Sequence, residues 1–457
     1  MSDAVIDLII IGAGPAGMTA ALQATTHGLS VVVLDEQASP GGQIYRQVLQ
    51  ADAHSRTVLG DDYTTGAKLV ADFLQCGARY LPNTSIWQVT PQRQVHYLTE
   101  GRAEVLQGRH LLIATGALER PMPIPGWTLP GVMTAGAGQI LLKSAALVPA
   151  SPVILAGCGP LLYLLAVQYL RAGVAIAGLV DTSNRSELLR AWRVLPAALR
   201  GWRDLLKGVG LLMALKRAGV RHFRGARNLR VEGTDRASAL RFDSGGRQHR
   251  IGAELILLHQ GVVPNTQISW SLRLDHDWSQ QQLCWIVRRN LMGETSVPGV
   301  FIAGDGGAIG GARVAQLEGR LVALAIAGQH APASLLQRAL CRARAARPLI
   351  DVLYRPQAQN RIPADDVTVC RCEEVSAGDI RRYVDLGCLG PNQTKAFGRC
   401  GMGPCQGRQC GLTVTEIIAE HRRVPPAEVG YYRIRSPLKP ITLAQLAGEH
   451  PPVEEPS

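Results

Sequence analysis

Two strand–turn–helix–strand units with glycine-rich turns, and a cysteine-rich C-terminal region, predict an α/β protein with a small additional module. The first unit covers residues 6–36 and the second covers residues 152–183, which makes them an internal repeat. The cysteine-rich region begins near residue 366. A chain of 457 residues is long enough for each of these parts to bury its own core.

The overall composition is that of a globular protein, and it argues against some partners. Hydrophobic residues make up 46% of the chain and charged residues 18%, which does not suit a disordered protein. The formal net charge of +12 would suit nucleic acid, but arginine is dispersed and aromatic residues, at 5%, are too few for base-stacking surfaces. We therefore expect no nucleic-acid partner, and a basic surface that docks another protein or an acidic membrane.

Two segments bear on the location of the protein. The first strand begins at about Asp7, which leaves no room for a signal peptide. The apolar run from Val153 to Leu170 has nearly the length of a membrane span, but Gly157 and Gly159 interrupt it, which predicts a buried strand, a turn and a helix. Ten cysteines in a leaderless protein favour a reducing compartment. We expect a cytoplasmic protein, with peripheral attachment to the inner membrane as an alternative.

The first unit, IDLIIIGAGPAGMTAALQATTHGLSVVVLDE, has the features of a dinucleotide-binding site. Gly12 permits the tight turn, Gly14 lets the backbone approach a pyrophosphate, and Gly17 lets the helix pack closely on the strand. The phosphates would lie at the helix N-terminus, where free N–H groups and the helix dipole favour negative charge. A carboxylate after the second strand can accept both hydroxyls of an adenosine ribose. The predicted binding residues are Gly12, Gly14, Pro15, Ala16, Gly17, Asp35 and Glu36.

Two later segments indicate which dinucleotide this site binds. One strand ends in Ala114-Thr115-Gly116, and another runs into Gly304-Asp305, followed by a helix from about Ala312. With the first unit they resemble the superfamily of glutathione and thioredoxin reductases, flavoproteins with two dinucleotide domains. The resemblance implies FAD in the first site, Asp305 on its ribityl chain, and the positive helix end near the flavin. The other implied FAD-binding residues are Gly42, Gln43, Thr115, Gly116 and Gly304.

The second unit repeats this plan, but its glycine fingerprint is incomplete. Gly157 and Gly159 are present, whereas Leu162 occupies the third glycine position, where a side chain should push the helix away from the strand. Asp181 ends the second strand and could still hold a ribose, and no arginine pair is available for a 2′-phosphate. We therefore predict a retained Rossmann-like domain that does not use NAD(P)H and is either purely structural or holds another nucleotide.

The dithiol of the disulfide reductases is missing from this chain. The segment PGGQIY has no cysteine after its glycines, and Cys158 has no CxxC partner. We therefore assign no catalytic residue. His259 ends a predicted strand and could touch a ligand, but the simpler interpretation is a histidine that closes this strand next to the domain junction.

A change in composition after Ala327 marks the approach to a separate module. The segment RALCRARAARPLIDVLYRPQAQNRIP has six arginines against one aspartate and predicts a basic helix and linker, either a solvated face or a docking surface. The expected domains are an FAD-binding domain (1–120 and 295–330), a second Rossmann-like domain (121–294), the linker (331–365), a cysteine-rich domain (366–425) and a C-terminal tail (426–457).

The cysteine-rich domain opens with VCRCEEVSAGD, in which Ser376 caps a predicted helix from Ala377. The second part, FGRCGMGPCQGRQC, adds three cysteines. A site of four thiolates could hold zinc or an iron–sulfur cluster, because both take tetrahedral sulfur ligands. Zinc ribbons usually present CxxC pairs, which this segment lacks.

The pattern CxC followed by GPCQGxxC resembles the [2Fe–2S] domain of bacterioferritin-associated ferredoxin and of anaerobic glycerol-3-phosphate dehydrogenase. The resemblance implies that the second cysteine pair lies within GPCQGxxC. Cys405 and Cys410 are followed by a helix predicted from about Thr413, whose N-terminal amides can stabilise anionic thiolates. We predict Cys370, Cys372, Cys405 and Cys410 as ligands, with Cys400 nearby and free.

The chain as a whole resembles the α subunits of the opine oxidase, D-hydroxyproline dehydrogenase and hydrogen cyanide synthase family, including GWTLPGVMTAGAGQILLKS and YYRIRSPLKPITLAQLAG. This resemblance implies the electron-transfer subunit of a dehydrogenase that oxidises the C–N bond of an amino acid, imino acid or opine. The implied partners are a β subunit similar to D-amino-acid oxidase, a small ferredoxin-like subunit, and a quinone or other acceptor. FMN between the subunits is a further implied cofactor.

Two other functions stay open from the sequence. The chain could be a self-contained NAD(P)H-dependent flavoprotein reductase that feeds the iron–sulfur cluster. It could instead be a non-catalytic assembly or binding protein with a structural flavin. Reduction of the purified chain by NADH or NADPH would favour the first of these, and a flavin that no partner and substrate reduce would favour the second.

Overall fold

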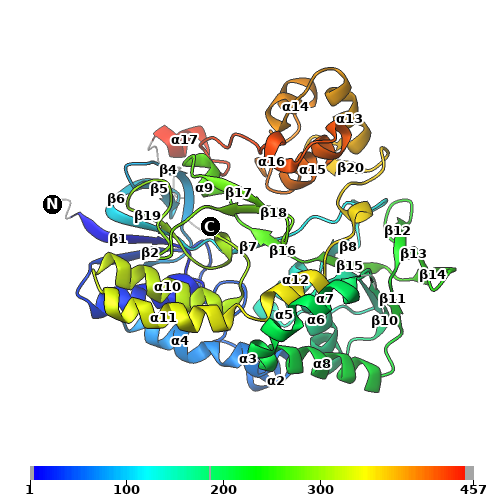
Figure 1. The fold of residues 1–457 in the computed structure, drawn as a ribbon, viewed down its shortest axis with the longest axis horizontal. Coiled ribbons are helices and arrows are strands. Elements are labelled where there is room, and N and C mark those ends of the chain that lie inside the picture. Colours follow the sequence, from blue (N-terminus) through cyan, green and yellow to red (C-terminus); the bar gives the residue numbers. More distant parts are fainter. Residues whose placement is uncertain (1–4, 185–186, 448–457) are drawn as a thin grey trace, which may run out of the picture.

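The computed structural model describes residues 5–184 and 187–447. They form two α/β units, each with its own sheet and helices, and a smaller helical module (Figure 1). The first sheet has the strand order β3-β2-β1-β6-β5-β4, and β19 pairs with β6. Strands β1, β2, β3, β6 and β19 run parallel. The bounds are β1 Ile6–Ile11, β2 Val31–Leu34, β3 Arg79–Leu81, β4 Ser85–Val89, β5 Gln94–Thr99, β6 Arg102–Ile113 and β19 Val300–Ile302.

Strand β19 returns to the first sheet after the second domain, so the first domain is built from two separate stretches of chain. Its helices are α1 Pro15–Thr26, α2 Ala53–Leu59, α3 Asp61–Thr64, α4 Gly66–Leu74, α10 Ala312–Ile326 and α11 His330–Ala343. Helix α10 begins at the predicted residue, Ala312. Helices α1 and α10 approach so closely that a Cβ at Gly319 would collide with the carbonyl oxygen of Ala16.

The second sheet is parallel, with the order β11-β10-β9-β15-β8. The predicted strand, turn and helix between Val153 and Leu170 are confirmed by β9 and α6. The strands are β8 Val132–Thr134, β9 Val153–Cys158, β10 Ile176–Asp181, β11 His222–Arg224 and β15 Leu255–Gln260, with α5 Ala135–Ala145, α6 Pro160–Arg171, α7 Glu187–Ala198 and α8 Trp202–Arg217. An antiparallel sheet of β12 Arg227–Glu232, β13 Ala239–Ser244 and β14 Arg247–Gly252 extends from it (Figure 1).

Short strands and helices connect the two sheets. Strand β7 (Ala117–Glu119) pairs with β16 (Val262–Pro264), and β17 (His276–Ser279) pairs with β18 (Cys284–Val287). Helix α9 (Gln267–Ser271) follows β16, and a 3-10 turn covers Gly304–Gly306 after β19. These elements place the ends of β6, β16 and β19 beside one another, which is where the predicted flavin residues lie.

The cysteine-rich module lies at the end of a long linker and packs onto the first domain (Figure 1). Its elements are β20 Thr368–Cys370, β21 Val375–Ser376, α13 Ala377–Asp385, α14 Pro391–Gly398, α15 Gly411–Arg422 and α16 Pro426–Val429, preceded by α12 Arg347–Leu353 and followed by α17 Leu443–Ala447. The predicted cap is confirmed, since Ser376 and Asp379 form a capping box on α13. Helix α15 begins two residues earlier than predicted, directly after Cys410.

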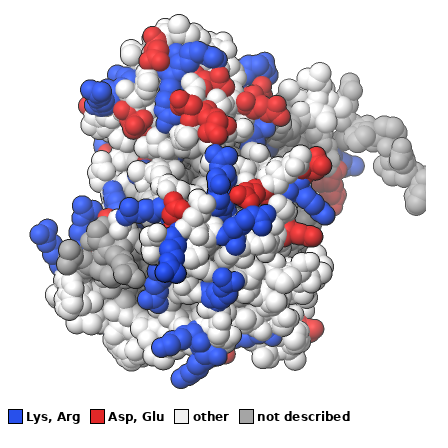
Figure 2. Space-filling model, turned by 90° about the vertical axis from the view of Figure 1, so that its right-hand side faces the viewer, with Lys and Arg blue, Asp and Glu red and all other residues white. Residues whose placement is uncertain are grey.

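On the face that Figure 2 shows, charge is mixed rather than gathered into one stripe. Figure 2 shows lysine and arginine side chains spread over one face, with acidic side chains among them in the upper part. Within residues 5–184 and 187–447, no helix combines the length and the apolar character that crossing a bilayer requires.

Candidate flavin site and cysteine cluster

The first glycine turn has the shape that a dinucleotide pyrophosphate needs. Gly12 has a φ of +106°, and a Cβ there would lie 2.5 Å from the carbonyl oxygen of Ala114. A Cβ at Gly17 would collide with the carbonyl oxygen of Gly12, so helix α1 lies directly against the turn. At Gly14, by contrast, the nearest atom to a Cβ is the Cα of Gly42, at 3.8 Å. The turn is therefore tightly packed at Gly12 and Gly17 but uncrowded at Gly14, which fits the pyrophosphate of FAD.

The two acidic residues after β2 have different roles. Asp35 is 9% exposed and accepts hydrogen bonds from the amides of Ala13 (2.5 Å) and Gln37 (2.7 Å). Burial raises the pKa of the Asp35 carboxyl group, and these two amides oppose the rise. Glu36 is more exposed and forms an ion pair with Lys439 of the C-terminal tail. Asp35 thus shapes the glycine turn, and Glu36 has the carboxylate that a ribose could reach.

The predicted ribityl and flavin residues converge at the carboxyl ends of β6 and β19. A Cβ at Gly306 would lie 3.4 Å from the amide nitrogen of Gly116 and from Oγ1 of Thr115. Asp305 accepts hydrogen bonds from the amides of Gly310 and Gly311, both at 2.8 Å, through one oxygen, Oδ1. Burial raises the pKa of the Asp305 carboxyl group, and these amides again oppose it. The arrangement fits a ribityl chain held by the second oxygen of Asp305.

A buried lysine beside this site is a residue that the sequence patterns did not indicate. Lys143 lies on α5, is 9% exposed, and donates a hydrogen bond to the carbonyl oxygen of Gln43 (2.9 Å). Burial, with a smaller contribution from nearby Arg46, lowers the pKa of its ammonium group to about 7. The sequence signal was a single lysine within an apolar helical segment, GQILLKSAAL, which is ambiguous without knowledge of the packing. Its charge stands next to a predicted FAD-binding residue.

His259 lies between Glu119 of β7 and the second glycine turn. It lies in β15 and is 2% exposed, which confirms the expectation that it closes a strand at the domain junction. Its Nδ1 lies 2.5 Å from Oε1 of Glu119, and the other oxygen of Glu119 accepts the amide of Gly136 (2.8 Å). A Cβ at Gly159 would lie 2.9 Å from Nε2 of His259. The ring is therefore bonded through Nδ1, and its Nε2 edge lies close to Gly159.

Five cysteines converge in the C-terminal module. The sulfur atoms of Cys370, Cys400 and Cys410 are buried and lie within 4.8 Å of one another. Cys372 and Cys405 form hydrogen bonds with each other. Cys400, predicted to be nearby and free, is thus one of the three adjacent thiols, and the predicted set of four ligands stays a prediction.

The chemistry of this cluster fits a metal–sulfur group. Cys400 and then Cys410 donate hydrogen bonds to Cys370, which lowers the pKa of the Cys370 thiol and favours its thiolate. The hydroxyl group of Tyr432 donates to Sγ of Cys400 at 3.3 Å. Helix α15 begins directly after Cys410, so its N-terminal end faces the sulfurs. Thiolates gathered in this way suit a [2Fe–2S] cluster or zinc.

The loop that contains Cys405 contacts residues 265–267, and the same three residues contact Gly116, a predicted flavin residue. The side-chain amide of Gln267 donates to the carbonyl oxygen of Gln406 at 3.2 Å, next to Cys405. Two residues before Gln267, the amide of Asn265 donates to the carbonyl oxygen of Gly116 at 3.0 Å. A few residues therefore connect the predicted flavin loop with the cysteine loop.

Aromatic packing supports the same contact. Tyr431 stacks on Trp270 with ring centroids 5.4 Å apart, and Trp270 meets the edge of Trp285 at 5.5 Å. Leu412 of α15 is buried in the same group. The module is therefore held on the flavin side by packed apolar groups as well as by hydrogen bonds.

Comparisons with known proteins agree with this architecture. The model of the pyridine nucleotide-disulphide oxidoreductase family matches residues 6–319, and that of the sarcosine oxidase A3 domain matches residues 367–450. The opine oxidase A subunit of Rhizobium meliloti (strain 1021) is 44% identical, over 96% of this chain and 98% of its own. The HcnB subunit of hydrogen cyanide synthase from Pseudomonas aeruginosa is 32% identical, over 95% and 96%. The crystal structure of L-proline dehydrogenase from P. horikoshii has the same fold, with a TM-score of 0.70, 18% identity, and 97% and 79% coverage.

Replacement of Gly14 by valine should empty the FAD site. The backbone there is extended (φ −79°, ψ −175°) and a Cβ would make only an ordinary contact with Gly42, so valine fits the folded chain, but its side chain would occupy the side from which the pyrophosphate approaches. Flavin absorbance per mole of purified protein should fall to near zero. Gly208→Val, on α8 where nothing lies near the added Cβ, should keep its flavin. Stoichiometric FAD in Gly14→Val would contradict the assignment.

Replacement of Lys143 by methionine should stabilise the protein at low pH. Because the pKa of Lys143 is about 7 when folded and 10.5 ordinarily, the unfolded chain binds more protons between these pH values, and wild-type stability from this group rises with pH there. Below about pH 7 the native state carries a buried charge. We expect Lys143→Met to raise the free energy of unfolding there by about 1–3 kcal/mol, and to lose this advantage near pH 10.5.

Denaturant titrations at several pH values measure this difference. The exposed Lys68 provides the matched control, and Lys68→Met should show no such pH dependence. A stability difference for Lys143→Met that stays constant with pH would contradict the buried charge.

Proposed function

We infer the function from one premise: the chain belongs to the pyridine nucleotide-disulphide oxidoreductase family and groups there with the A subunits of opine oxidases. It is a flavin-dependent oxidoreductase subunit of a kind that acts on amino-acid-like substrates. We propose that it is the FAD- and [2Fe–2S]-containing electron-transfer subunit of a dehydrogenase for the C–N bond of an amino acid, imino acid or opine.

The observation that carries this proposal is the contact between the two candidate sites. Gln267 bonds to the cysteine loop at Gln406, and Asn265 bonds to the flavin loop at Gly116. When bound, a flavin supplies two-electron chemistry and an iron–sulfur cluster supplies one-electron chemistry. A protein that converts one into the other needs both sites close together, and this contact supports that need.

The residues that would hold FAD follow from the first glycine turn. Gly12, Gly14 and Gly17 shape the turn, and Glu36 has the accessible carboxylate for the ribose. Asp305 has an oxygen left for the ribityl chain, since both loop amides use Oδ1. The amides at the N-terminus of α10 would stabilise negative charge on the flavin.

For the cluster we propose Cys370, Cys372, Cys405 and Cys410 as ligands. The hydrogen bond between Cys372 and Cys405 brings the two more exposed members of this set together, and Cys370 and Cys410 form the buried pair. Cys400 competes with this assignment, because its sulfur lies in the buried group. The hydroxyl group of Tyr432 gives Cys400 a hydrogen-bond partner of its own.

Partners follow from the relatives, whose names describe them as the A subunits of opine oxidases. We propose a β subunit resembling D-amino-acid oxidase, a small ferredoxin-like subunit, and FMN at an interface between subunits. The electrons would leave for a quinone or another acceptor that is not NAD. A cytoplasmic location with peripheral contact to the inner membrane suits such an acceptor.

Serine variants test the cluster assignment. Cys405→Ser and Cys410→Ser should abolish the visible and EPR signals of a [2Fe–2S] cluster, because serine oxygen is a poor ligand for these irons. Cys400→Ser should keep both signals. Cys388→Ser, which changes another buried cysteine of the same module, is the matched control and should also keep them. If Cys400→Ser loses the cluster and Cys405→Ser or Cys410→Ser keeps it, the assignment is wrong and Cys400 is a ligand.

Anaerobic reduction tests the proposed function. The protein would be purified with its natural partners and mixed with opines, imino acids and amino acids. We expect one of these to bleach the flavin and then to produce the EPR signal of a reduced cluster, and the isolated chain to remain oxidised. Reduction of the isolated chain by such a donor, or no reduction of the complex by any of them, would reject the proposal.

A further inference from the structure

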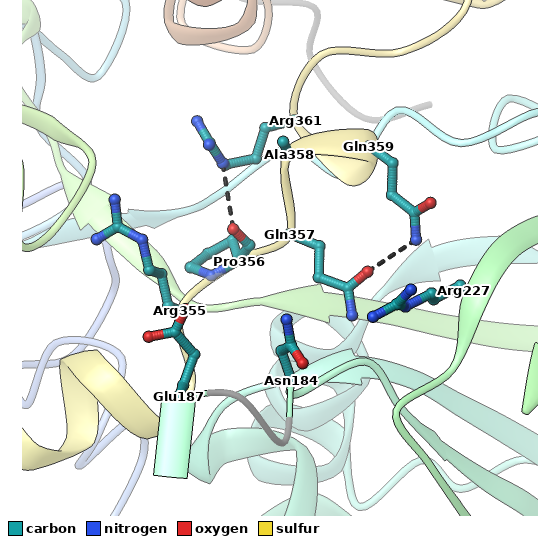
Figure 3. Close-up of a pocket in the computed structure, with 9 residues that line it drawn as sticks. All are labelled: Asn184, Glu187, Arg227, Arg355, Pro356, Gln357, Ala358, Gln359 and Arg361. Atoms are coloured by element: carbon teal, nitrogen blue, oxygen red, sulfur yellow. Dashed lines mark hydrogen bonds between the residues drawn. The ribbon is translucent and has the colours of Figure 1, made fainter. Parts of the chain in front are cut away.

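The crevice of the second dinucleotide fold contains a segment of the same chain. In parallel sheets of this class a nucleotide binds outside the carboxyl ends of the strands, where the strand order reverses. Here this point lies at the end of β9, between β10 and β15, next to the turn of Gly157, Cys158 and Gly159. Residues 354–361, which follow α12, run along this edge (Figure 3).

Tyr354 occupies the phosphate end of the crevice. The thiol of Cys158, between the two turn glycines, donates to the carbonyl oxygen of Tyr354 at 3.4 Å. The ring of Tyr354 also packs on Tyr163 of α6, with centroids 5.8 Å apart. A pyrophosphate must approach this turn closely, and at Gly14 in the first domain a Cβ would make only an ordinary van der Waals contact, with the Cα of Gly42. At the second turn a Cβ at Gly159 would lie 2.9 Å from Nε2 of His259, and the carbonyl group of Tyr354 lies against the thiol of Cys158.

The carboxylate expected to hold a ribose is already satisfied. Asp181 is 6% exposed, and its Oδ2 accepts the hydroxyl group of Tyr163 at 2.6 Å. Its Oδ1 accepts the amide of Ser183 at 2.7 Å. Nε2 of His222 lies 3.6 Å away from Oδ2. The phenol of Tyr163 thus takes the position in which a ribose hydroxyl would donate.

Gln357 and Asn360 bind the rest of the strand edge. The side-chain amide of Gln357 donates to the carbonyl oxygens of Thr182, after β10, and of Ala226, before β12. The carbonyl oxygen of Asn360 accepts the side-chain amide of Gln260, at the end of β15, at 3.0 Å. The segment is therefore bonded to the ends of successive strands across the crevice.

A polar pocket of about 380 Å³ remains at the adenosine end, and the segment itself forms one wall. Figure 3 shows Arg227 and Asn184 pointing toward Gln357, with Glu187 below Arg355. The pocket is lined by Asn184, Glu187, Arg227, Arg355, Pro356, Gln357, Ala358, Gln359 and Arg361. Arg227 and Arg355 bring positive charge to the rim, so the expectation that no arginine pair is available for a 2′-phosphate does not hold here, and NADPH is a stricter test of exclusion than NADH.

We propose that residues 354–361 occupy the second dinucleotide site as an internal ligand, and that Tyr354, Tyr163 and Gln357 exclude NAD(P)H from this protein. The exclusion is independent of which donor the complex oxidises. It would make the electron donor of this chain a partner protein rather than a nicotinamide.

The same segment also connects this crevice to the cysteine module. Arg361, at its end, forms an ion pair with Glu416 of α15, and both side chains are nearly buried. Two residues of the linker thus bind at opposite ends: Tyr354 at the glycine turn and Arg361 at the helix that follows Cys410. The segment that fills the second dinucleotide crevice therefore also attaches the cysteine-rich module to the second domain.

Hydrogen exchange and nucleotide titration test this inference without any substrate or partner. In the purified wild-type holoprotein, peptides covering residues 354–361 should exchange slowly, and NADH or NADPH at about 1 mM should neither bind nor alter this exchange. In Tyr354→Ala/Gln357→Ala, exchange of these peptides should increase at least about tenfold, because the packing of the Tyr354 ring on Tyr163 and the hydrogen bonds of Gln357 to the strand edge are lost. Gln359→Ala is the matched control, since its amide bonds only within the segment, and it should exchange as wild type does.

Two outcomes would overturn the inference. One is binding of NADH or NADPH to the wild-type protein while residues 354–361 stay protected, because the crevice would then have room for both. The other is unchanged exchange in the double variant. The wild-type titration decides the question even if the double variant does not fold, and neither measurement depends on reduction by an amine.

Discussion

The close approach of α1 to its own glycine turn is the constraint on which the rest of the flavin side depends. Gly17 lies against the carbonyl oxygen of Gly12, and Gly319 lets α10 reach α1 in the same way. Because two helices meet the backbone without intervening side chains, the ends of β1, β6 and β19 come together. Thr115, Gly116 and Asp305 are thereby brought to one place, although they come from distant parts of the chain.

The two dinucleotide folds show how one architecture takes different roles. At the first turn a Cβ at Gly14 would not collide with any neighbour, and an exposed carboxylate, Glu36, follows β2. At the second turn the chain itself supplies a carbonyl group, an aromatic ring and a phenol in place of phosphate and ribose. The turn and the ribose carboxylate of the second crevice thus have internal partners, as burial requires. The fold persists because its core needs both sheets, whether or not a nucleotide binds.

Contacts between remote segments explain how the module reaches the flavin side. The linker crosses the second domain, pairs with α15 through Arg361, and leaves the cysteine loop against Gln267. Tyr431 and Trp270 close the same interface by stacking. A module on a free tether would place its sulfurs at variable distances from the first domain, whereas this one is held by these contacts and by a hydrogen bond from Trp127 to the carbonyl oxygen of Thr368. That arrangement suits transfer of electrons between the two candidate sites.

The sequence by itself determined the local features: both glycine turns, the start of α10 at Ala312, the cap at Ser376 and a C-terminal group of cysteines. Each depends on residues close together in the chain, so spacing and residue type suffice. Only the tertiary structure decided that Cys400 joins Cys370 and Cys410, that Lys143 is buried beside Gln43, and that Tyr354 lies over Cys158. These contacts join residues that are far apart in the chain, up to 196 positions for Cys158 and Tyr354. These contacts are set by the packing of whole helices and strands, and no local sequence pattern encodes that packing.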